Sequence, residues 1–113
     1  AWVNDNPQTA KAYLRSYLRG LDWVLDPTNT SQAQQLLLTK MPAIKPKVVA
    51  SVMRSLLNPR TGLTPDGALL THGVKTVLDL RRKYGSGDLL PAENYLNSVC
   101  YKDVLQERLK AHG

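Results

Sequence analysis

Few side chains in this sequence could form a nucleophile and its base. Cys100 is the only cysteine, and His72 and His112 are the two histidines. A cysteine nucleophile needs a base within hydrogen-bond reach, and that base usually needs an orienting group such as Asp79, two helical turns beyond His72. Nothing in the sequence links Cys100 to this pair. We therefore expect a small packed cysteine, a histidine at the start of a helix and no catalytic site.

Other chemistries also lack their residue patterns. Asp22 and Asp26 lie one turn apart at a predicted helix end, which is typical of solvated acids. Scattered acids and two histidines predict no metal cluster, and one cysteine excludes an internal disulfide. Gly85-Ser86-Gly87 follows a predicted helix instead of a strand and is too short to cradle a phosphate. We therefore expect no enzyme, no metal and no cofactor, and the sequence identifies no ligand-binding residue.

The remaining candidates are aromatic and basic residues. The net charge of +6 comes from 15 Lys and Arg against 9 Asp and Glu, a balance that suits nucleic acid, anionic ligands or acidic partners without selecting one. The densest basic run, Arg81-Arg82-Lys83, fits the C-terminal end of a helix, and the alternative is phosphate contact. Trp2 and Trp23 could stack on a ligand, but Trp23 adjoins an apolar stripe, which favours packing.

The element around which the chain is organised is a helix over residues 6–25. Asp5 or Asn6 is expected to cap it, Pro7 suits its first position, and Pro27 bars its continuation. Apolar residues recur every three or four positions along it and predict one buried face. They are Ala10, Leu14, Tyr17, Leu18, Leu21, Val24 and Leu25.

Five further helical segments follow, at about 31–40, 46–57, 71–84, 91–96 and 98–110. The expected caps are Asn29 or Thr30 for the second helix and Thr71 for the fourth, and Gly85 is expected to close the fourth in a left-handed conformation. Thr64-Pro65-Asp66-Gly67 has the residues of a type I turn. Ala1-Trp2-Val3 is interpreted as the tail of a strand, and His112-Gly113 as a frayed end.

The fourth and sixth helices are expected to bury apolar faces. On the fourth helix, one face holds Val74, Val77, Leu78 and Arg81 and is extended by Leu80 and Tyr84. On the sixth, the residues expected to face inward are Tyr101, Val104, Leu105 and Leu109. The predicted fold is therefore all-α, with residues 1–113 as a single helical domain of five or six helices in a compact bundle. No apolar run approaches the length of a membrane span, and no basic-then-apolar leader is present.

One alternative function follows from charge and helices alone. The second and third predicted helices are joined by Met41 to Lys45, and Lys47, Ser51 and Arg54 fall on the outer side of the third. This is a loose match to a helix-turn-helix. The alternative is thus a basic helical module that binds nucleic acid or protein, and nucleic acid is not the partner we expect.

Three stretches of caps, turns and packing residues follow one another along the chain. The first contains Asn6-Pro7, Lys11-Ala12-Tyr13-Leu14, Asp22-Trp23, Asp26-Pro27 and Asn29. The second contains Pro65-Asp66-Gly67, Gly73-Val74-Lys75-Thr76-Val77-Leu78-Asp79-Leu80-Arg81 and Tyr84-Gly85. The third contains Pro91, Tyr95, Asn97, Tyr101 and Leu105. Together they resemble the C-terminal segment of ABC-importer substrate-binding proteins of the nitrate/sulfonate/taurine group, which includes binders of thiamine-pathway pyrimidine precursors. The family often has aspartate where this chain has Asn97.

The resemblance implies transport rather than catalysis. Such proteins have two α/β lobes joined by a hinge, hold a small and often anionic ligand between them, and are recognised by the ABC permease subunits when the lobes close. The chain would be the late helical part of such a protein, periplasmic or lipid-anchored outside the cell. The rest of the two-lobed protein would then cover its apolar faces. Alone, the helices would bundle together or form a homodimer.

Overall fold

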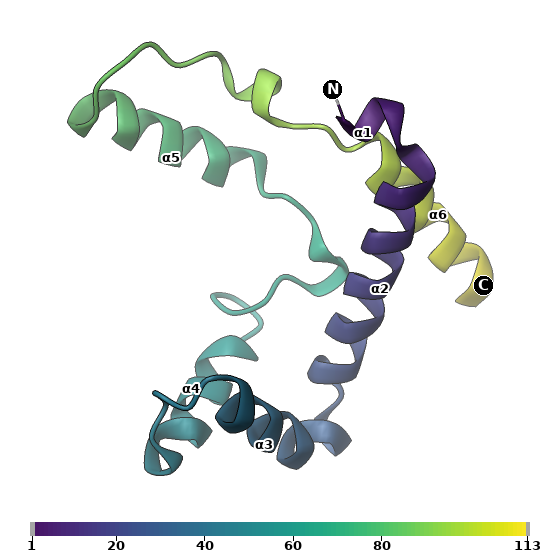
Figure 1. The fold of residues 1–113 in the computed structure, drawn as a ribbon, viewed down its shortest axis with the longest axis vertical. Coiled ribbons are helices and arrows are strands. Elements are labelled where there is room, and N and C mark those ends of the chain that lie inside the picture. Colours follow the sequence, from purple (N-terminus) through teal and green to yellow (C-terminus); the bar gives the residue numbers. More distant parts are fainter. Residues whose placement is uncertain (1, 113) are drawn as a thin grey trace. The chain divides into compact units, whose positions relative to one another are not determined.

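The computed structural model describes residues 2–112, and every regular element in that range is helical (Figure 1). The α-helices are α1 (Trp2–Asp5), α2 (Pro7–Leu25), α3 (Thr30–Lys40), α4 (Val49–Leu56), α5 (Thr71–Tyr84) and α6 (Val99–His112). Short 3-10 helices are η1 (Pro27–Asn29), η2 (Pro46–Val48), η3 (Pro65–Gly67) and η4 (Ala92–Tyr95). The all-α prediction is confirmed.

The described residues form two compact units, and the division falls within α2. Unit 1 contains the residues up to Leu14 together with those from Ala68 onward, and unit 2 contains Arg15–Gly67. The prediction of a single domain over residues 1–113 stays a prediction.

In unit 1, the start of α2 is tied to α6 by residues far apart in the sequence. Val104 is fully buried, and Ala10 and Cys100 are buried with it. The Cys100 thiol donates to the Pro7 carbonyl at 3.9 Å, and Asn97 Nδ2 donates to Asn4 Oδ1 at 3.2 Å. Of the inward residues predicted for α6, Leu109 is wrong, because it is 66% exposed.

In unit 2, the second half of α2 supplies Leu18 and Leu21, and α3 and α4 supply Ala33, Val49 and Met53, all of them buried. The predicted stripe of α2 is therefore largely confirmed, although Tyr17 is 49% exposed. A helix with its apolar residues on one face gains stability by burying that face.

The residues before α2 and the start of α5 differ from the prediction. Trp2 and Val3 lie in α1, so the strand prediction for these two residues is wrong, while Ala1 and Gly113 lie outside the described residues. Asn6 uses its side-chain amide as a donor to the Trp2 carbonyl, 3.0 Å away, which ties α2 to the helical turn before it. Thr71 is the first residue of α5, and Leu70 takes the cap position.

Gly85 ends α5 without the expected left-handed conformation. Its φ of −102° and ψ of −173° are extended, and its N–H donates to the Arg81 carbonyl at 2.7 Å. A Cβ atom at this position would lie 2.6 Å from the Arg81 oxygen. Close approach of backbone, and not a positive φ, is the reason that glycine fits here.

The turn at Thr64 to Gly67 is also different from the type I turn predicted. Asp66 has φ 64° and ψ −2°, which is the geometry of the third residue of a type II turn. The Gly67 N–H donates to the Thr64 carbonyl at 3.1 Å. A Cβ on Gly67 would lie 3.0 Å from Leu18 Cδ2, so packing against α2 within unit 2 explains the glycine.

Candidate functional site

The three residues considered for nucleophilic catalysis are not assembled. Cys100 is buried and its thiol is directed to the Pro7 carbonyl. Asp79 accepts a hydrogen bond from Arg82 at 3.0 Å, and His72 is exposed in the first turn of α5. A base that is exposed and a thiol that is bonded to backbone provide no activated nucleophile.

The carboxylates do not form a metal site either. Among the described residues, no group of three or more His, Cys, Asp and Glu side chains could hold a metal ion. Asp26 is exposed, as predicted, but it also caps η1 by accepting from the Thr28 N–H at 2.9 Å and the Thr28 hydroxyl at 2.8 Å. These hydrogen bonds, first that of the backbone N–H, lower the pKa of the Asp26 carboxyl.

Trp2 and Trp23 have local roles that the structure makes visible. The Trp23 carbonyl accepts from Asn29 Nδ2 at 2.9 Å, which fastens the end of α2 to η1. The Trp23 side chain is 37% exposed and that of Trp2 is 57% exposed. The Trp23 side chain is therefore covered by its neighbours to a greater extent than the Trp2 side chain.

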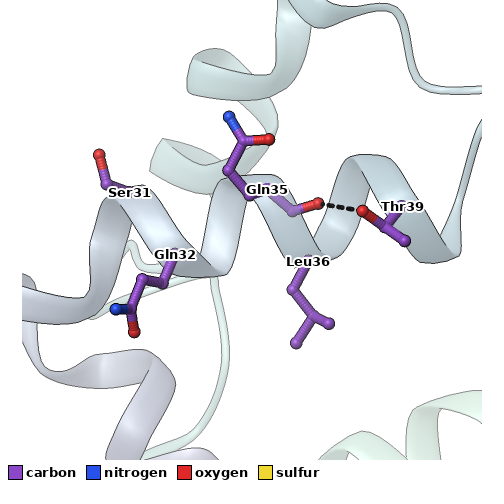
Figure 2. Close-up of a pocket in the computed structure, with 5 residues that line it drawn as sticks. All are labelled: Ser31, Gln32, Gln35, Leu36 and Thr39. Carbon is purple, nitrogen blue, oxygen red and sulfur yellow. Dashed lines mark hydrogen bonds between the residues drawn. The ribbon is translucent and has the colours of Figure 1, made fainter.

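A shallow pocket lies along one face of α3 (Figure 2). Its lining comes from Ser31, Gln32, Gln35, Leu36 and Thr39, all of one helix, and the Thr39 hydroxyl donates to the Gln35 carbonyl. Small-molecule sites surround most of a ligand's surface with converging groups. A wall made by one helix with no charged side chain does not do this, so the pocket is not a ligand site by itself.

An ion pair joins α2 to α6. Lys11 Nζ lies 2.7 Å from Asp103 Oδ2, and the Lys11 side chain is only 18% exposed. The hydrogen bond that Lys11 donates to Asp103 raises the pKa of Lys11 above 10.5. Lys11 thus serves to hold the two helices of unit 1 together.

An exposed apolar surface of unit 1 lies on α5. Leu78 is buried, but Val77 is 63%, Leu80 53% and Tyr84 74% exposed. Together with Gly73 these three residues follow the spacing i, i+4, i+7 and i+11, so they lie along one line of the helix. We call Gly73, Val77, Leu80 and Tyr84 the α5 stripe. The prediction that Val77, Leu80 and Tyr84 are inward is wrong in this structure, since only the Leu78 side is covered.

The basic run next to the stripe is engaged locally. Arg82 Nη1 pairs with Asp79 at 3.0 Å and Arg82 Nη2 donates to the Leu90 carbonyl at 3.1 Å. Lys83 Nζ lies 5.2 Å from the centre of the Tyr84 ring. The run thus behaves as the solvated helix end that was favoured, with two of its cations already partnered.

A second surface lies in unit 2, in a stretch of the chain that has basic residues but no acidic ones. From Pro27 to Pro65 the chain has five Lys and Arg residues and neither Asp nor Glu. Three of them, Lys40, Lys45 and Lys47, flank or lie in the segment between α3 and α4. We call residues 40–48 the basic loop. Its lysines are exposed, and so are Met41 at 52% and Val48 at 40%.

The basic loop also bears on the helix-turn-helix alternative. Eight residues, Met41 to Val48, separate α3 from α4, and they include η2. That link is longer than the turn of roughly three or four residues that the motif needs. Arg54, expected on the outer side of the third helix, donates to Ser51 Oγ at 2.9 Å. The match therefore stays loose, and the alternative of a basic interaction module stays a prediction.

The sequence contained a signal for the basic loop that charge density did not show. Counting basic residues in a row selects Arg81-Arg82-Lys83, whereas asking where acidic residues are absent selects Pro27 to Pro65.

None of the helices in the described range is long and apolar enough to cross a membrane. No protein-family model matches the chain, and neither a curated protein nor a solved structure was found to match it.

Proposed function

We propose that this chain is the late helical part of the solute-binding component of an ABC importer, of the group that takes up small, often anionic solutes such as nitrate, sulfonates or taurine. It has no catalytic role. Its partners are the rest of the two-lobed protein, the solute held by those lobes, and the permease subunits. The location is periplasmic, or extracellular with a lipid anchor.

The single observation that carries the proposal is the α5 stripe. Val77, Leu80 and Tyr84 are each more than half exposed although they lie on one line of a helix. Such a surface marks a place that another protein surface covers. A helix with one side packed within its own unit and another side bare is suited to the outer layer of an α/β lobe.

The residues that carry the family resemblance support the same proposal by their local roles. Pro7 opens α2, Asn29 is fastened to Trp23, and Tyr84 is the last residue of α5. Asn97 Oδ1 accepts from the Val99 N–H at 3.3 Å at the start of α6, where an acidic side chain would serve equally well. Each of these residues positions a helix, which agrees with a scaffold and assigns no ligand contact.

The experiment is solute binding by the protein encoded by the complete reading frame. Isothermal titration with taurine, nitrate and an alkyl sulfonate should give saturable binding of at least one of them, without chemical conversion. If the complete protein turns over a substrate, or if it contains no α/β lobes upstream of Ala1, the proposal is wrong.

A further inference from the structure

The basic loop carries an inference that is independent of the transport role. We propose that it docks the protein on the surface of an anionic lipid bilayer, with Lys40, Lys45 and Lys47 facing the headgroups and the Met41 and Val48 side chains entering the interface.

The first observation is unbalanced charge. The nearest acidic residues along the chain are Asp26 and Asp66, which lie on either side of the entire basic segment. Within the described part of the chain, Lys40, Lys45 and Lys47 form no ion pair. Their charge is therefore directed to solvent, unlike that of Arg82, which is neutralised by Asp79.

The second observation is that exposed apolar side chains lie among these lysines. Met41 directly follows Lys40, and Val48 directly follows Lys47. Two hydrogen-bonded turns keep the segment short, since the Ile44 N–H donates to the Met41 carbonyl and the Val48 N–H to the Lys45 carbonyl, each at 3.0 Å. Lysine stems lie along apolar surface while their ammonium groups reach polar surroundings, which is the arrangement that suits a headgroup layer.

The residue types favour lipid over nucleic acid. No Tyr, Trp, Phe or His occurs from Pro27 to Pro65, so no base could stack on this segment. The loop uses lysine instead of arginine. Arginine is favoured for bidentate recognition of a fixed phosphate or carboxylate, whereas lysine is a compact point charge that suits a diffuse anionic surface.

The test is vesicle co-sedimentation of the 113-residue chain. Vesicles that mix phosphatidylglycerol with phosphatidylcholine should bind it at low salt, pure phosphatidylcholine vesicles should bind it far less, and added salt should release it. The variant Lys40→Gln, Lys45→Gln, Lys47→Gln should lower the partition coefficient on the order of 100-fold, since each lysine near an anionic surface contributes about fivefold. Met41→Gln alone should lower it several-fold at unchanged charge.

The matched control removes the same charge from unit 1. Lys75→Gln, Lys102→Gln, Lys110→Gln changes three exposed lysines and should leave most of the binding intact. Circular dichroism checks that both triple variants keep the helical content of the unchanged chain. Equal loss in both triple variants, or equal binding to both kinds of vesicle, would overturn the proposal.

Two further arms separate the lipid from other polyanions. Inorganic phosphate should displace the chain from vesicles no better than sodium chloride of the same ionic strength; a specific effect of phosphate would overturn the lipid assignment. Double-stranded DNA should bind more weakly than the mixed vesicles. If DNA binds more tightly through the same three lysines, the loop is a nucleic-acid surface and the proposal is wrong.

Discussion

Lys11 Nζ and Asp103 Oδ2 are 2.7 Å apart, and this ion pair joins the first half of α2 to α6. The two residues lie near opposite ends of the chain, so the pair closes unit 1 between its N-terminal and C-terminal parts. Because the Lys11 side chain is largely covered, the pair is better protected from solvent than the exposed Arg82–Asp79 pair on α5.

Replacing Lys11 with Met should lower the free energy of unfolding at neutral pH, and the loss should shrink at alkaline pH. The pKa of Lys11 is raised in the folded state, so its stabilisation is complete below 10.5 and is lost as the pH rises through the folded-state pKa. Urea unfolding followed by circular dichroism at both pH values measures this. Lys102→Met on the exposed side of α6 is the control, and a deficit for Lys11→Met that does not change with alkaline pH would contradict the assignment.

Asp26→Ala should destabilise the junction between α2 and α3, because Thr28 loses the Asp26 Oδ1 atom that accepts both of its hydrogen bonds. The pKa of Asp26 is lowered, so its contribution is present above 3.8 and is lost as the pH falls through the folded-state value. Denaturation midpoints of the variant and the unchanged chain should thus converge in acid. Asp88→Ala, at an exposed position outside the helices, serves as the comparison and should shift the midpoint less.

Two leucines test which surfaces are covered. Leu18 is 1% exposed, and Leu18→Ala should cost about 2–5 kcal/mol of unfolding free energy. Leu80 is 53% exposed, and Leu80→Ala should change the stability of this chain by less than about 0.5 kcal/mol. In the complete protein of the proposed function, however, Leu80→Ala should cost about as much as a core substitution. A neutral effect there would show that nothing covers the α5 stripe.

Two glycines should respond in opposite directions to alanine. Gly20 lies within α2 and a Cβ there would meet no atom within 4 Å, so Gly20→Ala should stabilise by about 1 kcal/mol. Gly67 has φ +64° and lies close to Leu18, so Gly67→Ala should destabilise by about 1–3 kcal/mol. Thermal unfolding curves of the two variants check both signs. A loss of stability in Gly20→Ala would show that this side of α2 needs close approach of another surface.

The helices could be predicted from sequence because their limits depend on local chemistry. Proline fixes the backbone at Pro7 and Pro27, and both predicted boundaries there agree with the structure within about a residue. At Pro46 the 3-10 helix η2 begins, and α4 follows only at Val49. The predicted cap of the fourth helix was wrong by one residue: Thr71 is the first residue of α5, and Leu70 takes the cap position without a side-chain hydrogen bond.

Tertiary relationships were less accessible to prediction. Periodicity finds apolar faces, but it does not tell which of two faces on one helix meets a partner, so Leu78 and Leu80 were both placed inside. The ion pair of Lys11 with Asp103 depends on contact between distant segments, which spacing in one helix cannot show. Glycine at 67 signalled a turn, but the type II geometry rests on the positive φ of Asp66, which is not a glycine.

The measurement that most directly tests the proposed function is the reading frame that encodes this chain in its native gene, with mass spectrometry of the native protein. The account predicts an export signal and roughly two hundred residues ahead of Ala1, in which strands alternate with helices. An initiator methionine placed directly before Ala1 would contradict it.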